Sequence, residues 1–190
     1  MGQPPAEARP AATVILLRGG AERLEVLLAR RNPNARFMGG AWVFPGGAVD
    51  AAADASHRHT AVRELAEEAG LRLDDPEELV PFARWITPER LPIRFDTWFY
   101  VVPAPPEQEA RPDGAETVEA RWITPQAALA QHGSGKLDLM FPTVKTLEQL
   151  ARFANADALL EWARGREVRP VQPVVVGSGD DARIVIPPDG

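Results

Sequence analysis

Residues 46–71, "GGAVDAAADASHRHTAVRELAEEAGL", place a glycine-rich approach directly before a strongly acidic run. Phe44 and Pro45 precede the two glycines, and this group is typical of a turn that brings the backbone close to a site. Apolar residues then recur at helical spacing over about residues 57–69, and Gly70 suits a left-handed helix cap. The stretch therefore predicts a turn, a loop and an amphipathic helix.

Four charged side chains share one face of that helix: Arg63, Glu64, Glu67 and Glu68. At about 100° per residue they fall within an arc of about 140°, and apolar residues occupy the remaining surface. In one interpretation the charged face is simply solvated, and Arg63 pairs with Glu67 for a few tenths of a kcal/mol. That interpretation explains neither the glycines upstream nor carboxylates late in a helix, where the helix dipole disfavours them.

In a second interpretation the carboxylates bind a divalent metal ion. Three carboxylates at this spacing repel one another and hold protons unless a cation neutralises them. Mg²⁺ or Mn²⁺ prefers hard oxygen ligands and keeps positions free for water and substrate phosphate. A nearby glycine turn lets backbone groups approach the ion or a phosphate. The pattern thus indicates Mg²⁺ or Mn²⁺ as a cofactor for chemistry on a phosphate-bearing small molecule.

This stretch resembles the Nudix box, whose pattern is G-x5-E-x7-R-E-U-x-E-E-x-G-U with U an apolar residue. Residues 63–71, "RELAEEAGL", fall on the pattern. The resemblance implies an α/β fold, the Nudix-type α/β/α sandwich with a mixed β-sheet, and hydrolysis of a nucleoside diphosphate linked to another moiety. The box is two residues longer than the pattern, and Ala55 stands at the early glutamate position. We expect Asp50 or Asp54 to take over that supporting role.

The resemblance also implies roles for the residues of the box. Glu64 and Glu68 are similar to the principal metal ligands, and Glu67 is similar to a further ligand or positioning group. The carbonyl of Gly46 corresponds to a backbone ligand, and Arg63 to the residue that orients the glutamates. The general base stays open between Glu64 and four later glutamates, each of which has a solvated surface position as its alternative: Glu107, Glu109, Glu116 and Glu119.

The segment before the box bears on the substrate. Residues 27–47, "LLARRNPNARFMGGAWVFPGG", resemble the signature of the coenzyme A pyrophosphatase branch, LLTxRSxxxRxxxGxxxFPGG, with departures at Ala29 and Asn32. Arg31 and Arg36 match that signature, and guanidinium groups suit phosphate oxygens. The alternative is that both arginines lie in a solvent-facing loop. The backbone of Gly47 is a further candidate for contact with substrate.

A weaker resemblance concerns residues 84–105, "RWITPERLPIRFDTWFYVVPAP", which look like the acyl-CoA diphosphatase type within the same superfamily. Met140 and Phe141 are candidates to cover an acyl or pantetheine arm, or else to cap the core. Three tryptophans are candidates to stack on adenine, although aromatic residues in strands are more often core: Trp85, Trp98 and Trp122.

The leading hypothesis is hydrolysis of CoA or acyl-CoA to 3′,5′-ADP and a 4′-phosphopantetheine product. One alternative keeps the chemistry and changes the substrate to ADP-ribose, NADH or another nucleotide sugar or dinucleotide. Another alternative is a Nudix-fold module that binds its ligand without catalysis. Substrate choice resides in loops outside the box, where a single sequence is least informative.

The chain as a whole limits the partners. Its 190 residues suit one domain, and the net charge of −6 disfavours nucleic acid and anionic membranes as partners. It contains no cysteine, and no run reaches the roughly 18 apolar residues of a spanning helix. We expect a cytoplasmic protein with residues 1–10 as a flexible arm and residues 11–190 as a single domain with C-terminal helices and a short terminal hairpin. Members of the superfamily often dimerise, which leaves a homodimer open.

Overall fold

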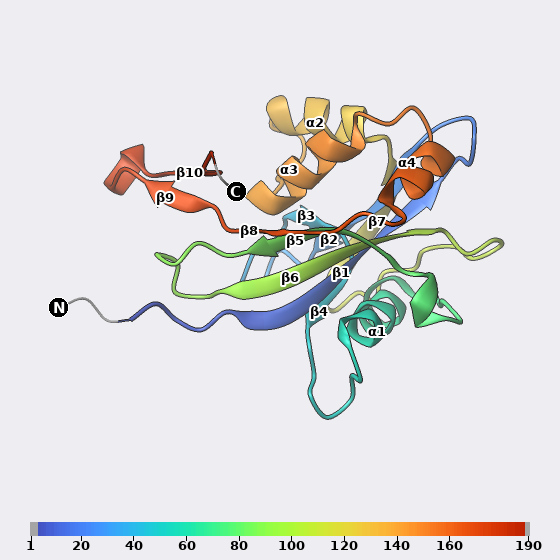
Figure 1. Cartoon of the computed structure of the whole chain (residues 1–190), viewed down its shortest axis with the longest axis horizontal. Coiled ribbons are helices and arrows are strands. Elements are labelled where there is room, and N and C mark those ends of the chain that lie inside the picture. The colour runs from blue at the N-terminus through green and yellow to red at the C-terminus, as the bar shows by residue number, and fades with distance from the viewer. Residues whose placement is uncertain (1–3, 189–190) are drawn as a thin grey trace.

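The computed structural model describes residues 4–188, which form a mixed sheet between two layers of helices (Figure 1). The sheet contains eight strands: β1 (Arg9–Arg18), β2 (Glu25–Arg31), β3 (Trp42–Val43), β4 (Gly46–Ala48), β5 (Val80–Ile86), β6 (Phe95–Pro103), β7 (Thr117–Ile123) and β8 (Pro170–Val171). They run in the order β3-β2-β1-β6-β5-β8, and β4 pairs with β1 while β7 pairs with β2. Strand β1 is parallel to β6 and antiparallel to β2 and β4.

Helices cover both faces of this sheet. In Figure 1, α1 (His57–Ala69) lies below it, and three helices lie above it: α2 (Pro125–Gly133), α3 (Phe141–Leu150) and α4 (Ala156–Ala163). The alternation of side chains along a strand divides the core accordingly. Ile15 and Leu17 join the apolar cluster under α2 to α4, whereas Val14 and Leu16 join the cluster that includes Leu65 of α1.

A sheet covered on both faces explains the unbroken apolar run of β1, which shows no polar alternation. The predicted α/β/α sandwich with a mixed sheet is confirmed.

The predicted turn over residues 45–47 is wrong, because this segment leads into strand β4. Gly46 lies opposite Thr13 and Gly47 opposite Ala12 in an antiparallel pair with β1. A Cβ on Gly46 would lie 2.4 Å from the carbonyl oxygen of Ala12. The glycine is therefore needed for close contact between two strands rather than for a positive φ angle.

Strand β1 begins at Arg9, inside the range expected as a flexible arm. The backbone N–H of Arg9 donates to the carbonyl oxygen of Arg94 at 2.9 Å, and Arg94 Nη1 donates to that of Ala6 at 2.6 Å. Residues 1–3 of the expected arm lie outside the described residues. Farther on, α3 begins at Phe141, and Pro142 is tolerated because it lies in the first turn of the helix.

The end of the chain adds a small separate sheet. Strands β9 (Val174–Val176) and β10 (Arg183–Val185) form an antiparallel hairpin that projects beyond β8 (Figure 1). Two short 3-10 helices, Pro76–Glu78 and Gly179–Asp181, complete the secondary structure. None of the helices within residues 4–188 has the length and apolar character needed to cross a membrane.

Candidate active site

Helix α1 is positioned by its caps and its apolar face. The Ser56 hydroxyl accepts the N–H of His59 at the start of the helix, and Gly70, with φ 66°, donates its N–H to the carbonyl of Ala66 at the end. The predicted helix and its left-handed cap are confirmed. Leu65 is fully buried against the strands, so the opposite face of the helix carries its glutamates toward the edge of β4.

Arg63 organises the acidic face. Its Nε and Nη2 atoms donate to the carboxylate of Asp54 at 3.0 and 2.9 Å. Its Nη1 atom donates to Glu64 at 2.8 Å and to Glu67 at 3.0 Å. The remaining contact, at 3.3 Å, reaches the carbonyl of Ala48 in β4. Arg63 therefore contacts both the strand and two of the three glutamates of the helix.

Asp54 anchors that arginine, in agreement with its expected supporting role. Its side chain is 2% exposed and also accepts the hydroxyl of Thr60 and the N–H of Asp50. The hydrogen bonds from Arg63 hold the pKa of the Asp54 carboxyl well below its usual range, and Asp54 in turn raises the pKa of Arg63. Asp50 is exposed and serves the loop instead, where its carboxylate accepts the N–H of Ala52.

Glu68 is the most buried carboxylate of the cluster, with a side chain 3% exposed. Its Oε2 atom accepts the N–H of Gly46 at 3.0 Å, and its Oε1 atom lies 3.9 Å from Nη1 of Arg31. Burial raises the pKa of the Glu68 carboxyl to about 7, and the nearby charge of Glu64 acts in the same direction. The N–H of Gly46 is the atom that meets Glu68, whereas the resemblance in sequence assigned the carbonyl of this residue to a metal ion, which stays a prediction.

Gly47 leaves room for the next carboxylate. A Cβ at this residue would lie 2.5 Å from the carboxyl carbon of Glu64, so the side chain of Glu64 rests directly against the backbone of β4. Burial raises the pKa of Glu64 as well. The two successive glycines thus have different neighbours. The missing side chain of Gly46 leaves room for strand β1, and that of Gly47 leaves room for the carboxylate of Glu64.

These donors fit a divalent cation in chemistry and in burial. Glu64 and Glu68 both have raised pKa values. Glu64 lies against the backbone of Gly47, and Glu68 accepts the N–H of Gly46. Such a site is short of positive charge, which a hard cation would supply. Over residues 4–188 no three Asp, Glu or His side chains converge on one point, because Arg63 holds Glu64 and Glu67 while Glu68 turns toward Gly46.

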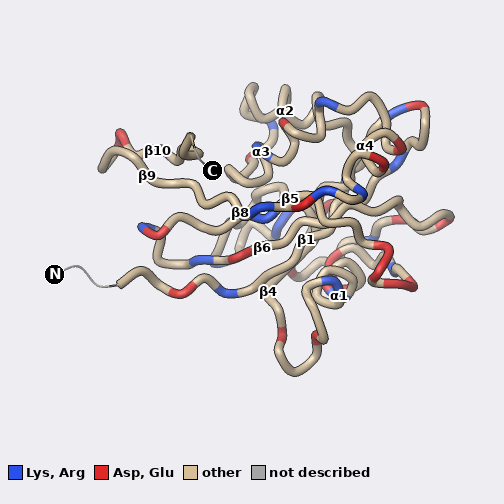
Figure 2. The backbone as a smooth tube through the Cα atoms, in the orientation of Figure 1, with Lys and Arg blue, Asp and Glu red and all other residues tan. Residues whose placement is uncertain are grey.

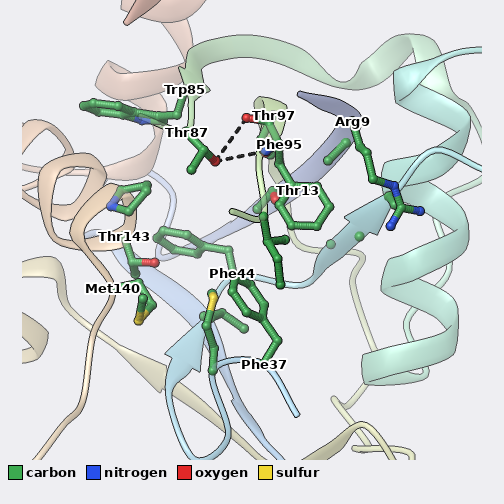
Figure 3. Close-up of a pocket in the computed structure, with 18 of the residues that line it drawn as sticks. Arg9, Thr13, Phe37, Phe44, Trp85, Thr87, Phe95, Thr97, Met140 and Thr143 are labelled. Carbon is green, nitrogen blue, oxygen red and sulfur yellow. Dashed lines mark hydrogen bonds between the residues drawn. The ribbon is translucent and has the colours of Figure 1, made fainter. Parts of the chain in front are cut away.

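The glutamates open into a cavity of about 830 Å³. Its floor is the face of the sheet presented by alternate residues of β1 and β6, and α3 closes one side, as Figure 3 shows from Thr143 and Met140 across to Thr13 and Arg9. Away from the acidic cluster the lining is mainly apolar and aromatic: Phe37, Phe44, Ile93, Phe95, Phe99, Met140 and Phe141. The volume and the mixture of charged and apolar walls are those of a site for a sizeable small molecule.

The structure separates the two arginines of the upstream segment. Arg31 lines the cavity, and its Nε atom is buried without a hydrogen-bond partner. Arg36 is exposed and does not belong to the residues that line the cavity. A group that supplies an acceptor to Arg31 therefore has a place beside Glu68.

Among the three tryptophans, Trp85 lines the cavity and the other two do not. Trp85 is buried, meets Phe141 edge to face at 6.3 Å between ring centroids, and donates its Nε1 hydrogen to Thr146. Trp98 stacks on Tyr100 on the opposite face of the sheet, and the ring of Trp122 lies under the guanidinium of Arg18. The core interpretation therefore accounts for Trp98 and Trp122.

The later glutamates are also separated. Glu116 lines the cavity, whereas Glu107 and Glu109 line a small polar pocket beside Gly70. Glu119 lies on β7 and pairs with Arg121 at 3.0 Å. Of these four candidates for the base, Glu116 alone faces the acidic face of α1.

The backbone of Glu116 is held from two sides. Its N–H donates to both carboxylate oxygens of Asp113, at 3.1 and 3.0 Å, and its carbonyl accepts the N–H of Asn32 at 2.8 Å. The hydroxyl of Thr117 donates to the carbonyl of Glu68 at 2.5 Å, which links this loop to α1. Sequence reasoning missed Asp113 and Asn32, although Asp followed by Gly at residues 113 and 114 is a turn signal that precedes a candidate base.

Comparisons with known proteins agree with this geometry. A family model described as the NUDIX domain matches residues 7–141. The chain belongs to the Nudix family. It is 28% identical over 202 residues to "Putative nudix hydrolase 7" of Caenorhabditis elegans, with 87% of this chain and 67% of that protein covered. The family and this relative mark the chain as an enzyme, a Nudix-type hydrolase, as the sequence predicted.

Two solved structures resemble most of the fold. A Nudix hydrolase from Alicyclobacillus acidocaldarius is 27% identical, with a TM-score of 0.71 over 82% of this chain and 96% of that one. The NUDIX domain of NrtR from Shewanella oneidensis, solved in complex with ADP ribose, is 22% identical with a TM-score of 0.60 over 77% of this chain and 88% of that one. The second likeness concerns the fold alone. Nudix hydrolases generally use divalent metal ions, which agrees with the acidic cluster described above.

Proposed function

We propose that this Nudix hydrolase cleaves the diphosphate of CoA or acyl-CoA, releasing 3′,5′-ADP and a 4′-phosphopantetheine product, with Mg²⁺ or Mn²⁺ as the metal. The proposal is supported by one observation above all. The acidic cluster and Arg31 lie at one side of a single cavity whose remaining walls are mainly apolar and aromatic. A substrate with a diphosphate next to a long, weakly polar arm matches both parts of this cavity.

The residues that would hold the metal are Glu64, Glu67, Glu68 and the carbonyl of Gly46. When bound, the ion polarises a phosphoryl oxygen and stabilises the charge that develops on the leaving phosphate. Arg31 binds a phosphate oxygen through its free Nε hydrogen, which positions the diphosphate beside Glu68. Arg63 keeps Glu64 and Glu67 oriented.

Glu116 is the proposed general base. Its carboxylate accepts a proton from the attacking water as the water oxygen bonds to phosphorus and the bridging P–O bond breaks. The hydrogen bonds from Asn32 and to Asp113 hold its backbone at the cavity wall. Glu64, the other candidate, has its Oε1 atom held by Nη1 of Arg63 at 2.8 Å and lies against the backbone of Gly47, so it serves as a cluster residue in this proposal.

The apolar part of the cavity would receive the pantetheine or acyl arm. Met140 and Phe141, at the start of α3, line it together with Trp85. Phe141 meets the edge of Trp85, so these side chains form a continuous wall. Such a wall offers no specific hydrogen-bond pattern and suits an arm that varies in length.

The test is hydrolysis of CoA, acyl-CoA, ADP-ribose and NADH by the pure protein with Mg²⁺ or Mn²⁺, with products identified by mass spectrometry. Release of 3′,5′-ADP from a CoA compound, lost in Glu68→Gln and kept in Glu161→Gln, is the expected result. Glu161 is an exposed glutamate on α4 and provides a matched control. Release of AMP from ADP-ribose or NADH, with no hydrolysis of the CoA compounds, would overturn the substrate assignment. The proposed metal site would still stand in that case. Binding of these ligands without turnover of any would instead support a non-catalytic module.

A further inference from the structure

Arg9 lines the cavity, and within the described residues its side chain has no salt-bridge or hydrogen-bond partner. In this it differs from the other arginines of the cavity, which lie close to carboxylates. The cavity contains three arginines: Arg9, Arg31 and Arg63. Arg63 is fully engaged by Asp54 and two glutamates, and Arg31 lies 3.9 Å from Glu68. The guanidinium of Arg9 has instead an aromatic neighbour, since it lies 5.9 Å from the centroid of the Phe95 ring.

The register of β1 places Arg9 relative to the acidic cluster. Thr13 lies opposite Gly46, which contacts Glu68, and Ala12 lies opposite Gly47, which contacts Glu64. Arg9 is three residues from Ala12, about 10 Å along an extended strand. The side chains of residues 9, 11 and 13 all face the cavity, because alternate residues of a strand share one face.

The surroundings of Arg9 are ordered by backbone contacts. Arg9 pairs in register with Phe95, and its N–H donates to the carbonyl of Arg94. Arg94 is buried and donates to the carbonyl oxygens of Ala6 and Thr87. Figure 2 shows basic residues at the adjoining starts of β1 and β6, and Figure 3 shows Arg9 at the opposite side of the view from Trp85. The backbone of Arg9 is therefore fixed by strand pairing, and its exposed side chain lies across the cavity from Trp85.

Aromatic surface adjoins this cation. Phe37, which is 42% exposed, lies 6.2 Å from Phe95 between ring centroids, and both rings line the cavity. A guanidinium beside one exposed and one half-buried aromatic ring can meet a phosphate with its N–H groups while the rings cover the flat part of the same ligand. The combination is suited to a nucleotide that carries a phosphate on its ribose.

We propose that Arg9, with Phe95 and Phe37, forms a second anion site that binds the ribose 3′-phosphate of the substrate's nucleotide. This inference rests on the proposed function, because it assigns the phosphate that distinguishes CoA from dinucleotides and nucleotide sugars. The diphosphate lies between Arg31 and the acidic cluster, the nucleotide extends toward Arg9, and the pantetheine arm extends toward Trp85 and Met140. Arg36, which the sequence suggested for a phosphate, has no part in this arrangement.

The first test compares CoA with dephospho-CoA as substrates. The ratio of kcat/KM for CoA to kcat/KM for dephospho-CoA is expected to be about tenfold to a hundredfold in the wild type, as a charged hydrogen-bonded contact provides. Arg9→Gln should bring this ratio close to one, and Arg9→Lys should restore part of it. Arg152→Gln removes one exposed arginine after α3 with the same change in net charge, so it should keep the wild-type ratio. Equal effects of Arg9→Gln on both substrates, or no effect, would overturn the inference.

The second test measures binding without turnover. Titration calorimetry of 3′,5′-ADP and of 5′-AMP into the wild type and Arg9→Gln should show that the added 3′-phosphate strengthens binding in the wild type alone. If CoA is hydrolysed but Arg9→Gln changes neither the ratio of kcat/KM values nor the preference for 3′,5′-ADP over 5′-AMP, the anion site is refuted while the proposed function stands. If CoA is not hydrolysed and 3′,5′-ADP still binds through Arg9, the anion site stands and the proposed reaction fails. Absence of any preference for 3′,5′-ADP in the wild type would also refute the site.

Discussion

Alanine at residue 47 should separate catalysis from folding. The added Cβ would lie 2.5 Å from the carboxyl carbon of Glu64, so the carboxyl must retreat by about 1 Å to reach ordinary contact. The atom that moves is the far end of a flexible side chain, and the backbone of Gly47 has no positive φ angle. The free energy of unfolding should therefore change by less than about 1 kcal/mol, the scale of a partly exposed ion pair. A displacement of about 1 Å in a positioned catalytic group costs on the order of a hundredfold in rate.

The neighbouring glycine supplies the control. A Cβ on Gly46 would lie 2.4 Å from the backbone carbonyl of Ala12, and neither paired strand can withdraw. Gly46→Ala should destabilise the fold by about 1 to 3 kcal/mol, as overpacking does. That cost corresponds to a melting temperature lower by about 2 to 12 °C in a protein of this size.

The assay is kcat/KM on whichever diphosphate substrate the panel identifies, together with thermal unfolding followed by circular dichroism. The expected result is a Gly47→Ala protein with a nearly unchanged melting temperature and about one hundredth of the wild-type kcat/KM. Wild-type activity in Gly47→Ala would refute the argument that the Glu64 carboxylate must rest against this backbone. A melting temperature as low as that of Gly46→Ala would refute the claim that the two glycines serve different neighbours.

Three further outcomes are expected. Asp54→Asn should lower the free energy of unfolding at pH 7 by about 2 kcal/mol, as for a lost hydrogen bond to a charged group. Because the pKa of Asp54 is lower in the folded than in the unfolded chain, its stabilising effect is present above about pH 4 and declines as the pH falls further. Denaturant titrations should therefore show that the wild type and the variant differ less in free energy of unfolding in acid than at pH 7. Glu116→Gln should lower kcat by about a hundredfold or more with little change in KM, as for a lost general base. Glu109→Gln, which changes a residue of the separate pocket, should match the wild type in steady-state assays. A larger loss of kcat in Glu109→Gln than in Glu116→Gln would contradict the assignment of the base. Removal of metal with EDTA should abolish turnover and added Mg²⁺ or Mn²⁺ should restore it, and full activity in metal-free protein would contradict the role of the glutamate cluster.

Helix α1 could be predicted from the sequence because its determinants are local. The spacing of Ala61, Leu65 and Ala69 sets the buried face, and Gly70 permits the left-handed residue that ends the helix. The acidic face follows from the same periodicity, so the sequence alone predicts that the glutamates cluster on one side of the helix. The sandwich followed from the resemblance carried by the same residues.

The contacts of Gly46 and Gly47 could not be read from the sequence. Two glycines after a proline predict a turn equally well, and the choice of strand β4 depends on β1, which lies more than thirty residues earlier in the chain. In the same way Asp54, one position from the expected glutamate, reaches Arg63 through a loop whose path the sequence pattern does not specify.

The sequence by itself determined the chemistry of this protein: three carboxylates and an arginine on one helical face, a glycine approach and a cap, all within one local segment. Tertiary structure alone decided which distant residues join them. Glu116 and Arg9 reach the cavity, whereas Arg36 and Glu109 remain outside it, through strand pairing between segments far apart in the chain. Local periodicity specifies which face of an element carries a side chain, and only the register of neighbouring strands specifies what that face meets.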